Sequence, residues 1–393
     1  MMSAGVGPVV AAPRALPAAP VEAKEVEAKP AEPARPQGPS TLDNLLQRAG
    51  DKLLRGAKPV QGAIVAIEAK SGRVLAFTAL TSSGTSFDVL TQARLPAASL
   101  FKVVTTTALF ETTALGLQDE VCISGGVHGI ERRHLDPARG PGTECGPFAW
   151  ALGHSKNAVF AQLATHRLTR DDLISTAERL GFNAKLPLDD GDQEAELGKL
   201  TLPYNDLEFA RAAAGFQGSS LSPVGAAYLM TLIARGGAPV GLRLHERAAD
   251  VANPAASLHA VAPFSARTAQ RLTRMLEVTV ETGTSRGAFT APDGKRYLPG
   301  IRVAGKTGTL RPAPAGPGGQ DSMTSWFVGF APSRSPEIVV SVMLENGHTY
   351  RRKANELARD LLRTYFRAHG RAQTVTDPFV EAPTDALADA STQ

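Results

Sequence analysis

The chain has 393 residues, of which 43% are hydrophobic, with 42 Lys+Arg against 38 Asp+Glu and a formal net charge of +4. This composition can bury a sizeable core, and so dilute a charge gives no argument for nucleic acid as a partner. Two cysteines exclude a disulfide-dense scaffold and an all-cysteine zinc site. The sequence also has no run of the ~20 apolar residues that a membrane span needs.

Both ends of the chain differ in composition from its middle. Ala and Pro dominate residues 1–40, which predicts a disordered Ala/Pro-rich tether. The apolar stretch 7–12 is short and interrupted by Pro8, so no secretory signal is visible in it. Polar residues 372–393 predict a flexible tail, and the folded domain is expected over 41–371.

The first elements of this domain are predicted from apolar periodicity. Leucines near a 3.6-residue period predict a helix over 41–54, which Thr41 can cap. Two β-branched runs, 62–68 and 73–80, flank Lys70-Ser71-Gly72 and predict a β-hairpin. A long apolar segment over 99–115 predicts a buried helix.

The second half of the domain predicts helices first and strands afterwards. Its expected elements are helices over 170–180, 223–234 and 352–368 and strands over 300–310, 325–331 and 338–344. This order predicts an α+β fold, in which both chain ends build one antiparallel sheet and a helical region is inserted between them.

Two motifs match known signatures in the wrong setting. Gly300–Thr307 fits the phosphate-binding pattern G-x-x-x-x-G-K-[ST], but its residues favour a strand and the following Pro312 opposes the required helix. Gly283–Gly287 fits G-x-S-x-G, the serine elbow of hydrolases, yet a helix and not a strand is predicted before it. We interpret them as a strand and a glycine-bounded turn.

A third set of residues is chemically coherent. Ser99 and Lys102 form S-x-x-K at the head of the buried helix, and their spacing places hydroxyl and amine on one face. Burial disfavours a charged amine, so the pKa of Lys102 should fall toward that of a general base. A lysine that extends along the helix to reach solvent is the alternative for Lys102 taken alone.

Two further motifs follow in the chain. Ser155-Lys156-Asn157 supplies a hydroxyl and a carboxamide. Lys306-Thr307-Gly308-Thr309, on a predicted strand, supplies a cation, two hydroxyls and a glycine that a ligand backbone can approach closely. Neither motif alone indicates a particular class of protein, but the three motifs in the order S-x-x-K, S-x-N, K-T-G are specific to one family.

With these motifs the chain resembles the penicillin-binding protein transpeptidase domain, a relative of the serine β-lactamases, over residues 57–368. Three further stretches are similar to that family: Gly62–Ala76, Gly215–Val224 and Trp326–Pro332. The resemblance implies a five-stranded antiparallel sheet flanked by helices, with an inserted all-helical subdomain. It implies no metal or organic cofactor.

The resemblance also implies roles for the motif residues. Ser99 would be the nucleophile, Lys102 its base, and Ser155 a relay of the proton to the leaving amine. Asn157 would bind the substrate amide. The remaining substrate-binding residues would lie on the predicted strand. Lys306, Thr307 and Thr309 would hold the substrate carboxylate, and Gly308 would let the backbone of the substrate approach.

The fate of the acyl-enzyme separates the functions that this family performs. Transfer to an amine is transpeptidation, transfer to water is carboxypeptidase or β-lactamase activity, and no transfer would suit a β-lactam sensor or a scaffold. One β-lactamase class uses an E-x-E-L-N loop for its deacylating base. Glu194-Ala-Glu196-Leu-Gly198 matches this loop except that Gly replaces the final Asn. Another β-lactamase class prefers S-x-V at the second motif, and Asn157 in the place of that Val argues against this class.

Several side chains that could bind a metal or form a disulfide lie between the first two motifs. They are Cys122, His128, His134, Asp136 and Cys145. The two cysteines could form a disulfide or remain free thiols. Together with the histidines they could also bind zinc, although their spacing does not resemble a zinc finger. His154 is interpreted as a structural neighbour of Ser155.

The expected function is therefore that of a peptidoglycan D,D-transpeptidase, a serine enzyme that binds D-Ala-D-Ala stem peptides and is acylated by penicillin. Its expected place is the periplasm or the outer face of the cytoplasmic membrane. Because no export signal is visible in residues 1–40, we expect either that the true N-terminus lies upstream of this sequence or that the export route is unusual. Cell-wall synthesis or division proteins are the expected protein partners, and nucleic acid is not.

Overall fold

The computed structural model describes residues 38–81, 85–189, 193–246, 261–311, 322–347 and 351–369. Residues 1–37 of the predicted tether and the whole predicted tail lie outside these ranges. The last three residues of the predicted tether are described, and Ser40 among them forms a β-bridge with His245. Within the described ranges, no helix combines the length and hydrophobicity needed to cross a membrane.

Both ends of the described chain contribute to one antiparallel sheet, as predicted. Its order is β10-β11-β12-β1-β2, and every neighbouring pair runs antiparallel. The strands are β1 (Gln61–Glu68), β2 (Val74–Leu80), β10 (Ala304–Leu310), β11 (Met323–Ala331) and β12 (Ile338–Asn346). The predicted turn before β2 is present, with Gly72 at φ 75°. Strand β10 lies at an edge of the sheet.

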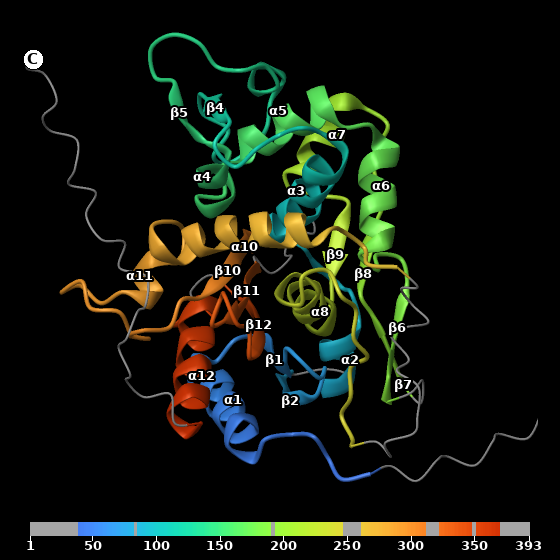
Figure 1. Cartoon of the computed structure of the whole chain (residues 1–393), viewed down its shortest axis with the longest axis vertical. Coiled ribbons are helices and arrows are strands. Elements are labelled where there is room, and N and C mark those ends of the chain that lie inside the picture. Colours follow the sequence, from blue (N-terminus) through green and yellow to red (C-terminus); the bar gives the residue numbers. More distant parts are fainter. Residues whose placement is uncertain are drawn as a thin grey trace, which may run out of the picture. The chain divides into compact units, whose positions relative to one another are not determined.

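Helices cover both faces of this sheet (Figure 1). Alternate side chains of β1 point to opposite faces. Ile64 and Ala66 join a core with α1 (Asn44–Ala57) and α12 (Ala354–Ala368). Val65 and Ile67 join the larger core, which includes α8 (Pro223–Ala234). Burial on two faces explains why the strands read as continuous apolar runs.

The region inserted between β2 and β10 is mainly helical. Its helices are α2 (Ser86–Thr91), η1 (Ala98–Leu100), α3 (Phe101–Thr112), η2 (Arg132–His134), α4 (Phe148–Gly153), α5 (Asn157–Arg167), α6 (Arg170–Arg179), α7 (Asp206–Ala213), α8, α10 (Ala266–Glu281) and α11 (Arg286–Phe289). Short strands also occur there, which the expectation of an all-helical insertion did not include. They are β3 (Leu95–Pro96), β4 (Glu120–Ile123), β5 (Glu144–Pro147), β6 (Lys185–Leu188), β7 (Gln193–Glu196), β8 (Gly198–Leu200) and β9 (Ser219–Leu221).

Three local predictions meet a definite outcome. The cap of α1 is Asp43, whose side chain accepts from Leu45 N and Leu46 N, whereas Thr41 donates to backbone oxygens and is not the cap. The phosphate-loop match ends inside strand β10, so no helix follows its Lys306. The G-x-S-x-G match begins in the turn after α10 and ends in the first two residues of α11, with Ser285 buried.

Candidate active site

Ser99 lies in the short helix η1, directly before the central helix α3. All of α3 from Phe101 to Phe110 is buried, so its N-terminal end is held firmly. The preceding Ala98 has φ 49°, a left-handed conformation that alanine adopts at a cost. Gly215 packs against it so closely that an added Cβ would lie 2.1 Å from Ala98 O. Ser99 therefore lies on a strained turn that its surroundings hold in place.

Lys102 is positioned one turn further along and points back to Ser99. Its side chain is fully buried, and its Nζ donates to Ser99 Oγ at 2.6 Å and to Asn157 Oδ1 at 2.7 Å. Burial, and then the nearby charge of Lys306, hold the pKa of Lys102 well below its usual range. A neutral amine at this distance can instead accept the hydrogen bond from the Ser99 hydroxyl and remove its proton.

Ser155 and Asn157 approach from the turn that joins α4 to α5. Ser155 has φ 56°, and its Oγ accepts hydrogen bonds from Lys102 Nζ at 3.4 Å and Lys306 Nζ at 3.0 Å. Asn157 directs its oxygen to Lys102 and donates its amide Nδ2 to Val127 O at 2.7 Å. Ser155 thus links the two buried lysines.

Strand β10 brings the third motif against η1. Lys306 donates to Ser155 Oγ and to Thr307 O, and burial lowers its pKa to about 7. At Gly308, an added Cβ would lie 3.4 Å from Ala97 O and from Ala98 Cβ. This is an ordinary van der Waals distance, so strand β10 lies directly beside the helix that carries Ser99, and a methyl group at this position would just fit.

These elements enclose a cleft of about 320 Å³. Among the predicted residues, Ser99, Ser155, Asn157, Thr307 and Thr309 line it. The other three, Lys102, Lys306 and Gly308, are buried and act from behind this surface through the contacts above. All eight predicted site residues are therefore brought together.

Sequence reasoning missed other side chains of the cleft. They are Thr284, Met323, Ser325, Trp326, Lys353 and Asn355. The hydroxyls of Thr284 and Thr307 form a 2.6 Å hydrogen bond. Thr284 belongs to the G-x-S-x-G match, so that motif did mark the site, although through its threonine. The indole of Trp326 donates to Pro96 O at 3.0 Å and ties β11 to the chain before η1.

The two glutamates weighed as a deacylating base lie elsewhere. Glu194 pairs with Lys185 at 2.9 Å, and Glu196 accepts from Ala93 N and pairs with Lys199. His154 stacks at a tilt on Trp150, with ring centroids 6.0 Å apart. Within the described ranges, no Asp, Glu or His side chain lines the cleft. A larger hollow of about 630 Å³, lined by α8 and α10, contains no serine–lysine pair.

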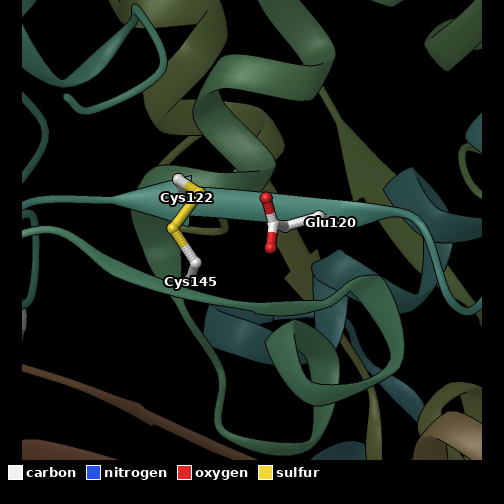
Figure 2. Close-up of side chains that lie close together, drawn as sticks. All are labelled: Glu120, Cys122 and Cys145. Carbon is white, nitrogen blue, oxygen red and sulfur yellow. A yellow bond between two sulfur atoms is a disulfide. The ribbon is translucent and has the colours of Figure 1, made fainter.

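The two cysteines form a disulfide, which decides among the alternatives left open for them. Cys122 on β4 and Cys145 on β5 are directly opposite each other in the ladder, and Figure 2 shows their sulfurs joined beside Glu120. Glu120, Cys122 and Cys145 lie close enough together to be considered as metal ligands. Because both sulfurs are bonded to each other, only the carboxylate of Glu120 remains to bind a metal. The hypothesis of a zinc site on these cysteines is therefore wrong.

Several known proteins are similar to this chain in sequence or in fold. The peptidoglycan D,D-transpeptidase PbpA of Mycobacterium tuberculosis is 26% identical over 351 residues, which cover 78% of this chain and 67% of that protein. The apo transpeptidase domain of Burkholderia pseudomallei penicillin-binding protein 3 has 23% identity and a TM-score of 0.67, covering 84% of this chain and 96% of that one. A ceftriaxone acyl-enzyme of M. tuberculosis penicillin-binding protein A has 22% identity and a TM-score of 0.63, covering 84% and 79%.

A family match extends over most of the folded region. The family described as penicillin binding protein transpeptidase domain matches residues 62–363, a span that contains all three motifs and the whole sheet except Gln61, the first residue of β1. This chain therefore belongs to the penicillin-binding protein transpeptidase domain family.

Proposed function

We propose that this chain is a peptidoglycan D,D-transpeptidase that forms an acyl-enzyme at Ser99. The observation that carries the proposal is the 2.6 Å contact between Ser99 Oγ and the fully buried Lys102 Nζ. The similarity to PbpA, named a peptidoglycan D,D-transpeptidase, supports the substrate class.

The chemistry begins with the neutral amine of Lys102. It takes the proton of Ser99 as Oγ attacks the carbonyl carbon of the penultimate D-Ala of a stem peptide. The peptide C–N bond then breaks, and the terminal D-Ala leaves with a proton that Ser155 passes from Lys102 to the leaving nitrogen. The contacts of Ser155 Oγ with both lysines support this relay.

Substrate contacts follow from the walls of the cleft. Thr307 and Thr309 would hold the substrate carboxylate by their hydroxyls, and Lys306 would add its positive charge from behind. Thr284, bonded to Thr307, would orient that hydroxyl. Asn157 would hold the substrate amide. Backbone N–H groups of Ser99 and Thr309 would form the oxyanion hole, a kind of contact whose loss costs about 3–4 kcal/mol.

The second half-reaction is the attack on the ester that joins Ser99 to the stem peptide, and its product depends on whether water or an amine attacks. Rapid hydrolysis needs a base that activates water, and among the described residues the cleft offers no carboxylate or imidazole for this. We therefore expect a long-lived acyl-enzyme whose acceptor is an amine of a neighbouring stem peptide. The same lifetime would let β-lactams inhibit the enzyme.

This function places the domain where peptidoglycan is built, outside the cytoplasmic membrane. We propose the folded unit over 41–371, with the segments before and after it as tether and tail. Cell-wall synthesis or division proteins are the protein partners that we propose for it.

Labelling with a fluorescent penicillin tests the proposal. The chain should acquire a covalent label that Ser99→Ala abolishes, while its folding, followed by circular dichroism, stays intact. The label should persist for hours, whereas a β-lactamase would lose it within seconds. An equal label on folded Ser99→Ala would refute the assignment of the nucleophile.

A further inference from the structure

The segment closed by the disulfide lies against the second motif of the active site. Cys122 and Cys145 join the ends of a segment whose middle approaches α5 and α7. There Arg211 Nε donates to Ile130 O at 2.9 Å, and Gln162 Nε2 donates to Asp136 O at 3.1 Å. The segment is therefore fixed both at its base and along its length.

Its first contact with the motif is through backbone oxygens. Asn157 Nδ2 donates to Val127 O at 2.7 Å and to Gly126 O at 3.3 Å. Gly125 and Gly126, both at φ 74°, shape the turn that presents these oxygens. Since the Nδ2 end of the carboxamide is bound here, its oxygen is directed to Lys102.

The second contact is through charge, next to the disulfide itself. Glu144, adjacent to Cys145, places both carboxylate oxygens 2.7 and 2.9 Å from Lys156 Nζ. The same ammonium lies 4.6 Å from the ring centre of Trp150 on α4. Lys156 is thus held from two sides, and it lies between Ser155 and Asn157 in the chain.

The motif needs such support because of its backbone. Ser155 has φ 56°, a conformation that a serine leaves readily unless neighbours restrain it. A change there would move Ser155 Oγ, which bridges Lys102 and Lys306. Displacements of a catalytic group by about 1 Å can slow a reaction by about a hundredfold.

We infer that Glu144 and Lys156 are positioning residues, and that the disulfide-closed segment 122–145 holds Ser155 and Asn157 in their active geometry. The inference builds on the proposed acylation of Ser99. It assigns to the disulfide a role in the rate of acylation and not in folding alone. Reduction should therefore slow acylation reversibly in protein that remains folded.

Charge-removing variants test this inference. Acylation by a fluorescent penicillin should fall by about tenfold in both Glu144→Gln and Lys156→Met, while Lys156→Arg, which can keep the ion pair, should retain most of the rate. A purely electrostatic influence on Lys102 would shift the rate in opposite directions, because one variant removes a negative charge and the other a positive one. Loss of positioning predicts the same direction for both.

The chain offers a matched control pair. Lys185 and Glu194 form an exposed ion pair of 2.9 Å on the β6–β7 hairpin, and neither lines the cleft. Lys185→Met and Glu194→Gln should acylate at the wild-type rate. Reduction and reoxidation of the wild-type chain complete the series.

Hydrogen exchange of the backbone over 153–158 is measured in the same samples and does not depend on acylation. Exchange there should speed up in Glu144→Gln and in reduced protein. Wild-type rates and wild-type exchange in both would overturn the inference. A wild-type chain that takes no label would instead contradict the proposed function, and the exchange measurement would still decide the positioning role.

Discussion

Gly215→Ala should disable the active site although Gly215 does not line the cleft. Gly215 has φ 85°, and an added Cβ would lie 2.1 Å from Ala98 O, whereas such contacts essentially never fall below 3.0 Å. One of the two backbones must therefore move by about 0.9 Å. The left-handed conformation adds a penalty of about 1 kcal/mol for alanine.

The movement matters because the carbonyl of Ala98 is joined directly to the nitrogen of Ser99. The hydroxyl of Ser99 makes a 2.6 Å contact with Lys102, and a shift of nearly 1 Å would break it. We expect the second-order rate constant of acylation to fall by about a hundredfold. The measurement is the time course of labelling by a fluorescent penicillin, with urea denaturation for stability.

Gly236→Ala is the matched control. Gly236 also has a left-handed φ, 69°, but no atom within 4 Å of an added Cβ. It should lose about 1 kcal/mol of unfolding free energy and keep the wild-type acylation rate. If Gly215→Ala acylates as fast as Gly236→Ala, the strained turn does not position Ser99.

Two further predictions concern the lowered pKa of Lys306 and the proposed slow deacylation. Burial lowers the pKa of Lys306 to about 7, against ~10.4 in an unfolded chain. Between these pH values the unfolded state binds more protons, so the free energy of unfolding should rise with pH, by up to ~1.4 kcal/mol per pH unit from this group. Urea denaturation across this range should show a shallower rise in Lys306→Met, and an identical slope would contradict the lowered pKa. Glu196→Gln should lower the melting temperature slightly, through its contacts with Ala93 and Lys199, and leave the lifetime of the acyl-enzyme unchanged. A longer lifetime in this variant would identify Glu196 as a deacylating base.

Much of the fold was predictable because its elements carry local signals. The hairpin of β1 and β2 has apolar strands on both sides of a short turn with glycine at positive φ. Helix α8 begins with Pro223 at its first turn and ends near Gly236. Helix α12 places Leu361, Leu362 and Tyr365 on one buried face. Short strands such as β4 and β5 were missed, since their four residues give too little periodicity.

The sequence by itself determined the three motifs, their order and the family, because the chemistry of acyl transfer needs particular side chains at fixed short spacings. Only the tertiary structure decided how those side chains lie relative to one another. It closed the disulfide, buried Lys102 and Lys306 beside Ser155, and added Thr284 to the cleft. Lowered pKa values and hydrogen bonds across the cleft depend on burial and on distances between segments far apart in the chain. No local pattern encodes these quantities, so they emerge only when the sheet edge, α3 and the disulfide-closed segment come together.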